Sequence, residues 1–143
     1  IWDDNIIFIP VRPGNNRLYT MSNIISNPDV GIFFMIPGIE DTLRVNGKAS
    51  IVKDKEILER CVVNRKVPSM GIMVEVNEAF LHCAKAIRRS KLWKPESQQD
   101  PSEMPTLAQM ILEQVATPDK PPTKEEIKEG DDFIEDNYKT GLY

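Results

Sequence analysis

The sequence predicts a mainly β fold, a small antiparallel barrel with helices appended after it. Two observations indicate this class. Strand-like apolar runs come first in the chain with short helical segments between them, and longer helical segments follow at the end. The βαβ alternation that a doubly wound parallel sheet requires is missing from this order. The succession of elements therefore favours a barrel over a doubly wound sheet.

Four segments have the length and the apolar pattern of strands: residues 6–9, 30–36, 42–52 and 70–83. Pro10 ends the first, because proline has no N–H to donate to a neighbouring strand. The second is apolar throughout, which is typical of a central strand. The third alternates, so Leu43 and Val45 face one way while Thr42 and Arg44 face the other. The fourth is long enough for one bent strand or for two in succession.

The predicted helices span residues 21–26, 55–62, 107–116 and 124–138, with a helical turn at 84–89. Thr20 and Asp54 can cap the first two helices, since their side-chain oxygens can accept from free backbone N–H groups. Capping boxes at 106–109 and 123–126 open the last two. We therefore expect the C-terminal part of the chain to be helical.

A segment rich in Pro, Ser and Gln at residues 94–105 has the composition of a linker. It predicts two parts: a barrel domain over residues 1–93, and a linker with a helical extension over residues 94–143. The last helix carries an apolar stripe that needs a partner surface, on the barrel or on a dimer partner.

The bulk composition excludes several function classes. The 143 residues are 41% hydrophobic and 28% charged, as in an ordinary soluble globular protein. A net charge of −4 argues against a nucleic-acid partner, and no apolar run approaches the roughly 18–20 residues of a membrane span. Cys61 and Cys83 fit no metal-site spacing and indicate free thiols in the cytoplasm.

Common enzyme motifs are absent from the sequence. It has no G-x-S-x-G, no P-loop and no G-x-G-x-x-G motif. His82 is the single histidine, which excludes a His-rich metal site. His82 and Cys83 are adjacent in a predicted strand and face opposite ways, so His82 is a poor activator of that thiol. We predict no metal site and identify no catalytic residue.

The turn at residues 12–17 is the first candidate anion site. Arg12 and Arg17 flank Asn15 and Asn16 close to a predicted helix start. Guanidinium forks, amide donors and free backbone N–H groups together suit a phosphate. An ordinary solvated turn with surface arginines would have the same sequence, so the turn alone does not decide between them.

Two further features are candidates for a planar, charged guest. Arg44 lies mid-strand, two residues from Thr42, on a face that is either solvated or a ligand site. Lys85, Ser90 and Trp93 belong to a second polar cluster that also holds arginines. A cation beside an indole suits a planar, charged ligand, whereas a surface turn with one packed Trp is the alternative.

Taken together, these residues resemble the pyridoxamine 5′-phosphate oxidase-related flavoproteins, the FMN-binding split-barrel family. The segments that carry the resemblance are RPGNNR at 12–17, NPDVGIFF at 27–34, TLRVNGKA at 42–49 and HCAKAIRRSKLW at 82–93. The resemblance implies a six-stranded antiparallel Greek-key split barrel, of which the first strand would precede Ile1. It also implies a homodimer that holds FMN at the subunit interface.

The resemblance assigns roles to particular residues. Arg17 would hold the FMN phosphate with its neighbours in the turn, Thr42 and Arg44 would approach the ring system, and segment 82–93 would reach the flavin of the partner subunit. The cofactor-binding residues so implied are Pro10, Arg12, Asn15, Asn16, Arg17, Thr42, Arg44, His82, Lys85, Ser90 and Trp93.

The function implied is that of a cytoplasmic FMN-dependent oxidoreductase acting on a small-molecule substrate. The alternative from another class is a non-catalytic carrier or sensor that holds flavin or haem on the same barrel. A structural dimer without cofactor is a further alternative, and a deazaflavin could replace FMN.

Overall fold

The computed structural model describes residues 3–14 and 18–142. The chain divides into two compact units, Ile1–Gln98 and Gln99–Tyr143. The division falls inside the segment 94–105, whose composition is that of a linker.

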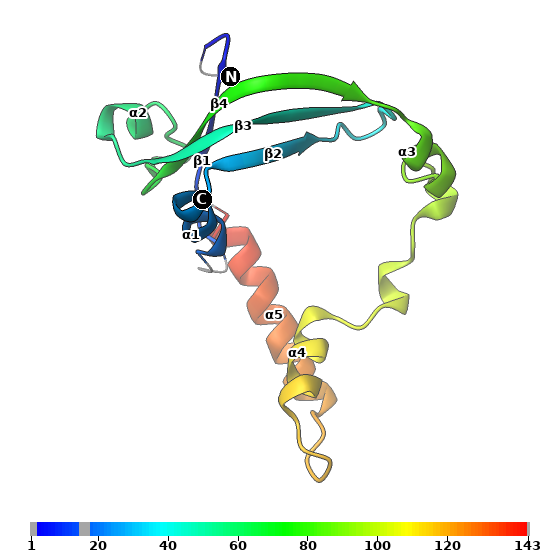
Figure 1. The fold of residues 1–143 in the computed structure, drawn as a ribbon. Helices are drawn as coiled ribbons and strands as arrows, with labels where there is room; N and C mark the ends of the chain where they lie inside the picture. Colours follow the sequence, from blue (N-terminus) through cyan, green and yellow to red (C-terminus); the bar gives the residue numbers. More distant parts are fainter. Residues whose placement is uncertain (1–2, 15–17, 143) are drawn as a thin grey trace. The chain divides into compact units, whose positions relative to one another are not determined.

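The first unit is built on a four-stranded antiparallel sheet with the strand order β1-β4-β3-β2 (Figure 1). Its strands are β1 (Ile6–Pro10), β2 (Asp29–Phe34), β3 (Thr42–Val52) and β4 (Gly71–His82). The predicted segment 70–83 therefore contains one long strand, β4, which is the first of the two predicted alternatives. The prediction that the second strand is central is wrong, because β2 lies at the edge of the sheet. Its apolar side chains Phe33 and Phe34 are 45% and 38% exposed.

The described residues form an open sheet and not the predicted six-stranded barrel. β1 has five residues and pairs only with Gly71–Glu75, the first part of the twelve-residue β4. β1 and β2 occupy opposite edges and do not pair with each other. Closure would require both edges to be paired, so the sheet keeps two free edges in the described part of the chain.

A β-bulge interrupts the pairing of β3 with β4. Gly47 pairs with Val76, but the neighbouring Asn46 pairs with Glu78, so Asn77 is an extra residue on β4. Gly47 fits this position because an added Cβ would lie 2.2 Å from the carbonyl oxygen of Glu75. The close approach of two backbones therefore requires glycine here.

The bulge changes which face the later side chains of β4 point to. Val76 and Ala79 are three residues apart, yet both line one groove. Phe80 and His82 consequently share a face with Arg44, whose direct neighbour is Phe80. One face of the sheet is apolar and the other carries the polar and aromatic residues of the candidate site.

Helix α1 (Tyr19–Ser26) covers part of the apolar face. Its Ile24 is 6% exposed and packs with Ala49 of β3 and Val74 of β4 in the core of this unit. The prediction that Thr20 caps this helix is wrong. The N-cap is Leu18, which has no side-chain oxygen, and packing of Ile24 holds the helix in place instead.

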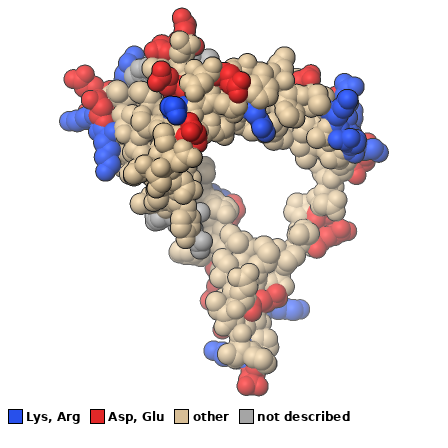
Figure 2. Space-filling view, in the orientation of Figure 1, with Lys and Arg blue, Asp and Glu red and all other residues tan. Residues whose placement is uncertain are grey.

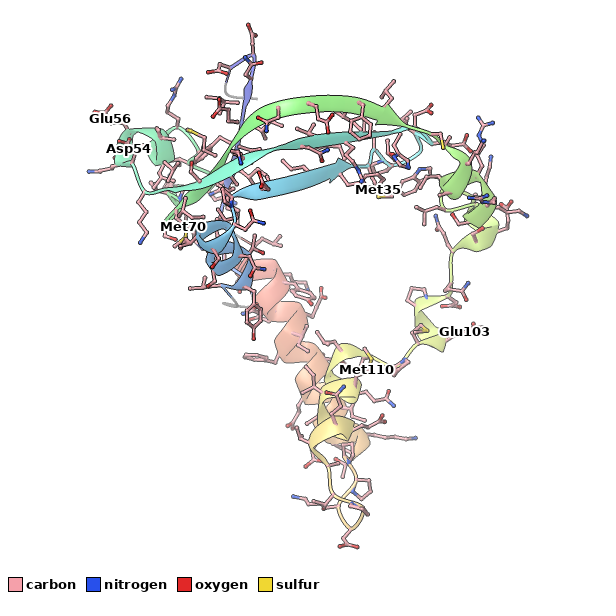
Figure 3. All side chains as sticks on the ribbon, in the orientation of Figure 1. Met35, Asp54, Glu56, Met70, Glu103 and Met110 are labelled. Carbon is pink, nitrogen blue, oxygen red and sulfur yellow. The ribbon has the colours of Figure 1, made fainter. Side chains whose placement is uncertain are left out.

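The other helices of the first unit are α2 (Lys55–Glu59), α3 (Lys85–Ser90) and the 3₁₀ turn η1 (Pro95–Ser97). Asp54, labelled in Figure 3, caps α2 as predicted. Its side chain accepts from the N–H of Ile57 at 3.1 Å. The helix ends at Glu59, three residues before the predicted end. A tight turn follows, in which Asn64 and Arg65 have positive φ angles of 50° and 62°.

The second unit contains η2 (Pro101–Glu103) and two helices, α4 (Leu107–Val115) and α5 (Lys124–Thr140). Both predicted helix starts are confirmed, but only the second has the complete predicted capping box, at Thr123. Thr106 accepts from the N–H of Gln109 at 3.1 Å, whereas the Gln109 side chain donates to Glu113 at 2.8 Å and does not complete the box. The two helices approach closely where Gly130 meets Ala108, since an added Cβ on Gly130 would lie 2.8 Å from the Cβ of Ala108.

The two units carry opposite charge. Residues 1–98 hold 14 Lys and Arg against 11 Asp and Glu, whereas residues 99–143 hold 4 against 11. In Figure 2, Lys and Arg gather over α3, at the end of the sheet where β4 stops. The negative net charge of the chain therefore comes from its helical unit.

Candidate functional site

Adjacent residues of three strands form a row on the polar face of the sheet. Phe33 of β2 and Phe80 of β4 are the direct neighbours of Arg44 on its two sides. Thr42 and His82 form the next pair on this face, where β3 begins and β4 ends. We refer to these five residues as the Arg44 cluster. The two phenylalanines are not predicted from the sequence, because the cross-strand register is needed to place them beside Arg44.

Arg44 lies among aromatic rings without an acidic partner. Its guanidinium carbon is 5.7 Å from the centroid of the Phe33 ring, a cation–π distance. Phe33 in turn meets His82 edge to face, with centroids 6.3 Å apart. No carboxylate among the described residues forms an ion pair with Arg44, whereas Lys48 on the same face of β3 lies 2.7 Å from Asp29. The positive charge of Arg44 is therefore available to a ligand.

Thr42 presents a buried hydroxyl to this cluster. The residue is 3% exposed, and its Oγ1 has no hydrogen-bond partner among the described residues. Buried polar atoms without partners are rare, because each costs about 1–3 kcal/mol. A ligand that accepts or donates a hydrogen bond at Oγ1 would remove this cost.

Two contacts fix the loop that leads into β3. The indole Nε1 of Trp93 donates to the carbonyl of Ile39 at 2.7 Å, and Nε of Arg88 donates to the carboxylate of Glu40 at 2.6 Å. Together they tie α3 and the residues after it to the strand that carries Thr42. The sequence points to Trp93 as a ligand contact, and the structure shows that its N–H positions a loop.

Lys85 and Ser90 are the first and last residues of α3. Both are exposed, and the hydroxyl of Ser90 donates to the carbonyl of Ile87 at 3.1 Å. Because α3 follows directly after the end of β4, it lies at the same end of the sheet as the Arg44 cluster.

Pro10 and Arg12 lie at the opposite end of the sheet. Pro10 pairs with Gly71, the first residue of β4, and His82 is the last. At roughly 3.3 Å per residue the two ends of β4 are about 36 Å apart along the strand. Arg12 donates from Nη2 to the carbonyl of Cys61 at 2.5 Å, which anchors the segment after α2. One copy of the chain therefore does not bring all predicted site residues together.

The structure describes only residues 12–14 of the predicted phosphate turn at 12–17. Asn15, Asn16 and Arg17 lie outside the described residues, and their role stays a prediction.

A groove of about 270 Å³ opens on the apolar face. Residues that line it include Phe34, Leu43, Val45, Val76 and Ala79, together with Asp3 and Asp4. It lies on the opposite face of the sheet from Arg44, so it is separate from the Arg44 cluster.

No group of three or more His, Cys, Asp or Glu in the described part of the chain could hold a metal ion. Every described helix is too short or too polar to span a membrane.

The comparisons with known proteins give a distant structural likeness. No protein-family model matches the chain, and no curated protein does. A crystal structure of tagged HupZ from Group A Streptococcus is 20% identical, with a TM-score of 0.48 over 57% of this chain and 66% of that one. A histidine-to-alanine variant of HupZ is 21% identical, with a TM-score of 0.47 over 57% and 70%. A likeness of this size assigns neither a family nor a function.

Proposed function

We propose that this protein binds FMN in sites built from two copies of the chain and acts as an FMN-dependent oxidoreductase on a small-molecule substrate. The observation that carries the proposal is the Arg44 cluster, in which an arginine without an acidic partner stands beside a buried, unpartnered hydroxyl. The resemblance of residues 12–17 and 82–93 to the FMN-binding split-barrel family selects FMN among planar anionic ligands.

The residues present fit the chemistry of a flavin. An isoalloxazine ring is planar, has carbonyl and ring-nitrogen acceptors along one edge, and is anionic at that edge when reduced. Arg44 supplies N–H donors and positive charge for that edge, and the Thr42 hydroxyl can complete a hydrogen bond there. The exposed ring of Phe33 offers an apolar surface beside them. FMN, when bound, supplies hydride or single-electron transfer.

The separation of the predicted site residues supports the use of two copies. Pro10 and Arg12 are at one end of β4 and the Arg44 cluster is at the other, about 36 Å along the strand. A single mononucleotide cannot extend over this length. Contributions from two copies would let the turn at 12–17 hold the phosphate while the Arg44 cluster of the partner contacts the ring.

Spectroscopy of the purified protein tests the cofactor. A flavin absorption spectrum and the mass of FMN released on denaturation are expected. A protein that carries no flavin and binds no added FMN would overturn the proposal. Bleaching of the flavin band by reduced nicotinamide cofactor would then distinguish an enzyme from a carrier that only stores the cofactor.

A matched pair of variants tests the site. Arg44→Met should weaken FMN binding by about tenfold or more, because it removes a charge-assisted hydrogen bond. Lys48→Met is the control, since Lys48 lies on the same face of β3 but pairs with Asp29. Equal FMN dissociation constants for the two variants, measured by flavin fluorescence, would remove Arg44 from the site.

A haem carrier on the same sheet is the second candidate. The observation in its favour is His82, an exposed histidine at the end of β4 beside the ring of Phe33. A single imidazole can serve as an axial ligand of haem iron. A Soret band that His82→Ala abolishes, without any flavin spectrum, would select this alternative.

A further inference from the structure

β4 has an edge that β1 covers only in part. β1 pairs with Gly71–Glu75, and the carbonyl of Asn5 accepts from the N–H of Val76 at 2.8 Å. Within the described residues, no strand pairs with this edge beyond that point, so it stays open along residues 77–82. Leu81 is 78% exposed there. An open strand edge that carries apolar side chains is a template for another strand.

We propose that a second copy of the chain pairs with this edge through the same residues, in an antiparallel register centred on Phe80. The two-fold axis then places Phe80 opposite the partner's Phe80. Ala79 lies opposite the partner's Leu81, and Glu78 lies opposite the partner's His82. The interface is isologous, and the two four-stranded sheets join into one.

The choice of register follows from the faces of β4. Residues directly opposite each other in antiparallel strands point to the same face. Ala79 pairs with Val45 and lines the groove, while Phe80 and Glu78 pair with Arg44 and Asn46 of β3 on the other face. Centring on Phe80 therefore matches aromatic with aromatic and small with large apolar side chains.

The neighbouring register of the same symmetry is less favourable. If the axis passed through Ala79, Phe80 would lie opposite the partner's Glu78 and Leu81 would lie opposite the partner's Asn77. Each apolar side chain would then meet a polar one. In the register centred on Phe80, the carboxylate of Glu78 meets the imidazole of the partner's His82, which can donate a hydrogen bond to it.

The same register covers the groove on the apolar face. Ala79 lines this groove of about 270 Å³, so the partner's Leu81 comes to lie at its wall. The start of the partner's α3, with Lys85, approaches the turn of Asp3 and Asp4, which also line the groove. Opposite charges meet at this rim, which favours a second copy over an unrelated apolar strand.

The interface deepens the proposed function and rests on its two-copy cofactor site. Antiparallel pairing brings the partner's His82 opposite Glu78, about 23 Å along β4 from Gly71 and its neighbour Pro10. Within one copy the corresponding separation is about 36 Å. The pairing therefore draws the Arg44 cluster of one copy toward the Arg12 end of the other.

Charge substitutions at position 80 test the register, because the two-fold axis places this side chain opposite the same side chain of the partner. In sedimentation equilibrium, the parent protein should have twice the 16.3 kDa mass of a single chain. Phe80→Lys and Phe80→Glu should each weaken association by about tenfold or more, since like charges then lie opposite each other. An equimolar mixture of the two variants should restore the dimer. Ile25→Lys is the control, because Ile25 is also exposed but lies on α1, outside both β4 and the Arg44 cluster.

A cross-link tests the same contact without charge. Phe80→Cys in a Cys83→Ser background should form a disulfide-linked dimer on mild oxidation, and Ile25→Cys in the same background should not. A monomeric parent, or Phe80→Lys and Phe80→Glu variants that associate like the parent, would overturn the interface. Failure of the mixed variants to re-associate, with each still folded by circular dichroism, would overturn the register.

Measurements with and without FMN separate this inference from the proposed function. If the protein binds no FMN but forms dimers that the Phe80 variants weaken, the interface is supported and the flavin site is refuted. A monomer that binds FMN would refute the interface and leave the flavin assignment standing.

Discussion

Replacing Thr42 with valine removes a hydroxyl that is buried without a partner in the free protein. Thr42 is 3% exposed, and its Oγ1 forms no hydrogen bond with the described residues. Burial of an unpartnered hydroxyl costs about 1–3 kcal/mol, and valine keeps nearly the same volume. We therefore expect Thr42→Val to stabilise the free protein by about 1 kcal/mol, which raises the melting temperature by about 4 °C.

Urea unfolding of the flavin-free protein measures this gain, which should appear as a higher midpoint with an unchanged slope. Thr106→Val is the matched control. The Thr106 hydroxyl accepts from the N–H of Gln109 at 3.1 Å and caps α4, so its loss should cost about 1 kcal/mol. Replacing threonine with valine should therefore raise the free energy of unfolding at position 42 and lower it at position 106. A destabilised Thr42→Val protein would refute the reasoning, because it would mean that Oγ1 has a partner.

At Thr42 the expected effect on ligand binding is opposite to the effect on stability, because the variant should be more stable but should bind FMN more weakly. If the hydroxyl hydrogen-bonds the ring of a bound flavin, Thr42→Val should raise the FMN dissociation constant by about fivefold. A site of this kind sacrifices stability in the free state to position a ligand. A variant that is more stable and binds FMN as tightly as the parent would separate Thr42 from the site.

Three further outcomes are expected. Arg12→Met should lower the free energy of unfolding by about 1.5 kcal/mol in urea titrations, because it removes a charged donor from a carbonyl after α2. Gly47→Ala should cost about 2 kcal/mol or more by the same assay, since the new Cβ would meet the carbonyl oxygen of Glu75. The backbone N–H of Thr123 lowers the pKa of Glu126. The stabilisation of the start of α5 is therefore present at neutral pH and is lost as the pH falls through that lowered pKa. Amide chemical shifts of α5 should report this loss, and Glu126→Gln should abolish its pH dependence.

Local chemistry in the sequence predicted local structure. Thr42–Val52 has the bounds that its alternation indicates, and Asp54 and Thr123 cap the helices that follow them. Each of these features depends on residues a few positions apart, so a short window contains all the information. Thr20 failed as a cap because Leu18 takes that place and burial of an apolar residue holds α1.

Long-range pairing set the features that the sequence did not predict. Continuous apolar character made residues 30–36 look like a central strand, although β2 is an edge strand that ends at Phe34. Whether an apolar strand is covered depends on how many partners the sheet supplies, which its own residues do not encode. The contacts of Trp93 with Ile39 and of Arg88 with Glu40 likewise join residues about fifty positions apart.

The sequence predicts only part of the candidate site, because the rest depends on long-range strand pairing. Alternation placed Thr42 and Arg44 on one face, and the pairing of β3 with β4 adds His82 beside them. Pro10 and Arg12 lie at the other end of the sheet from these residues, because β1 pairs with the first residues of β4.

Asn77 makes the composition of both faces depend on how one extra residue is accommodated. If the bulge were lost and Asn77 paired with Asn46, every later side chain of β4 would stay chemically unchanged but turn to the reverse surface. Ala79 would then lie beside Arg44, and Phe80 would point among aliphatic groups. Recognition at this end of the molecule is thus encoded as much in strand register as in residue identity, and a slip of one position would erase it without altering any binding residue.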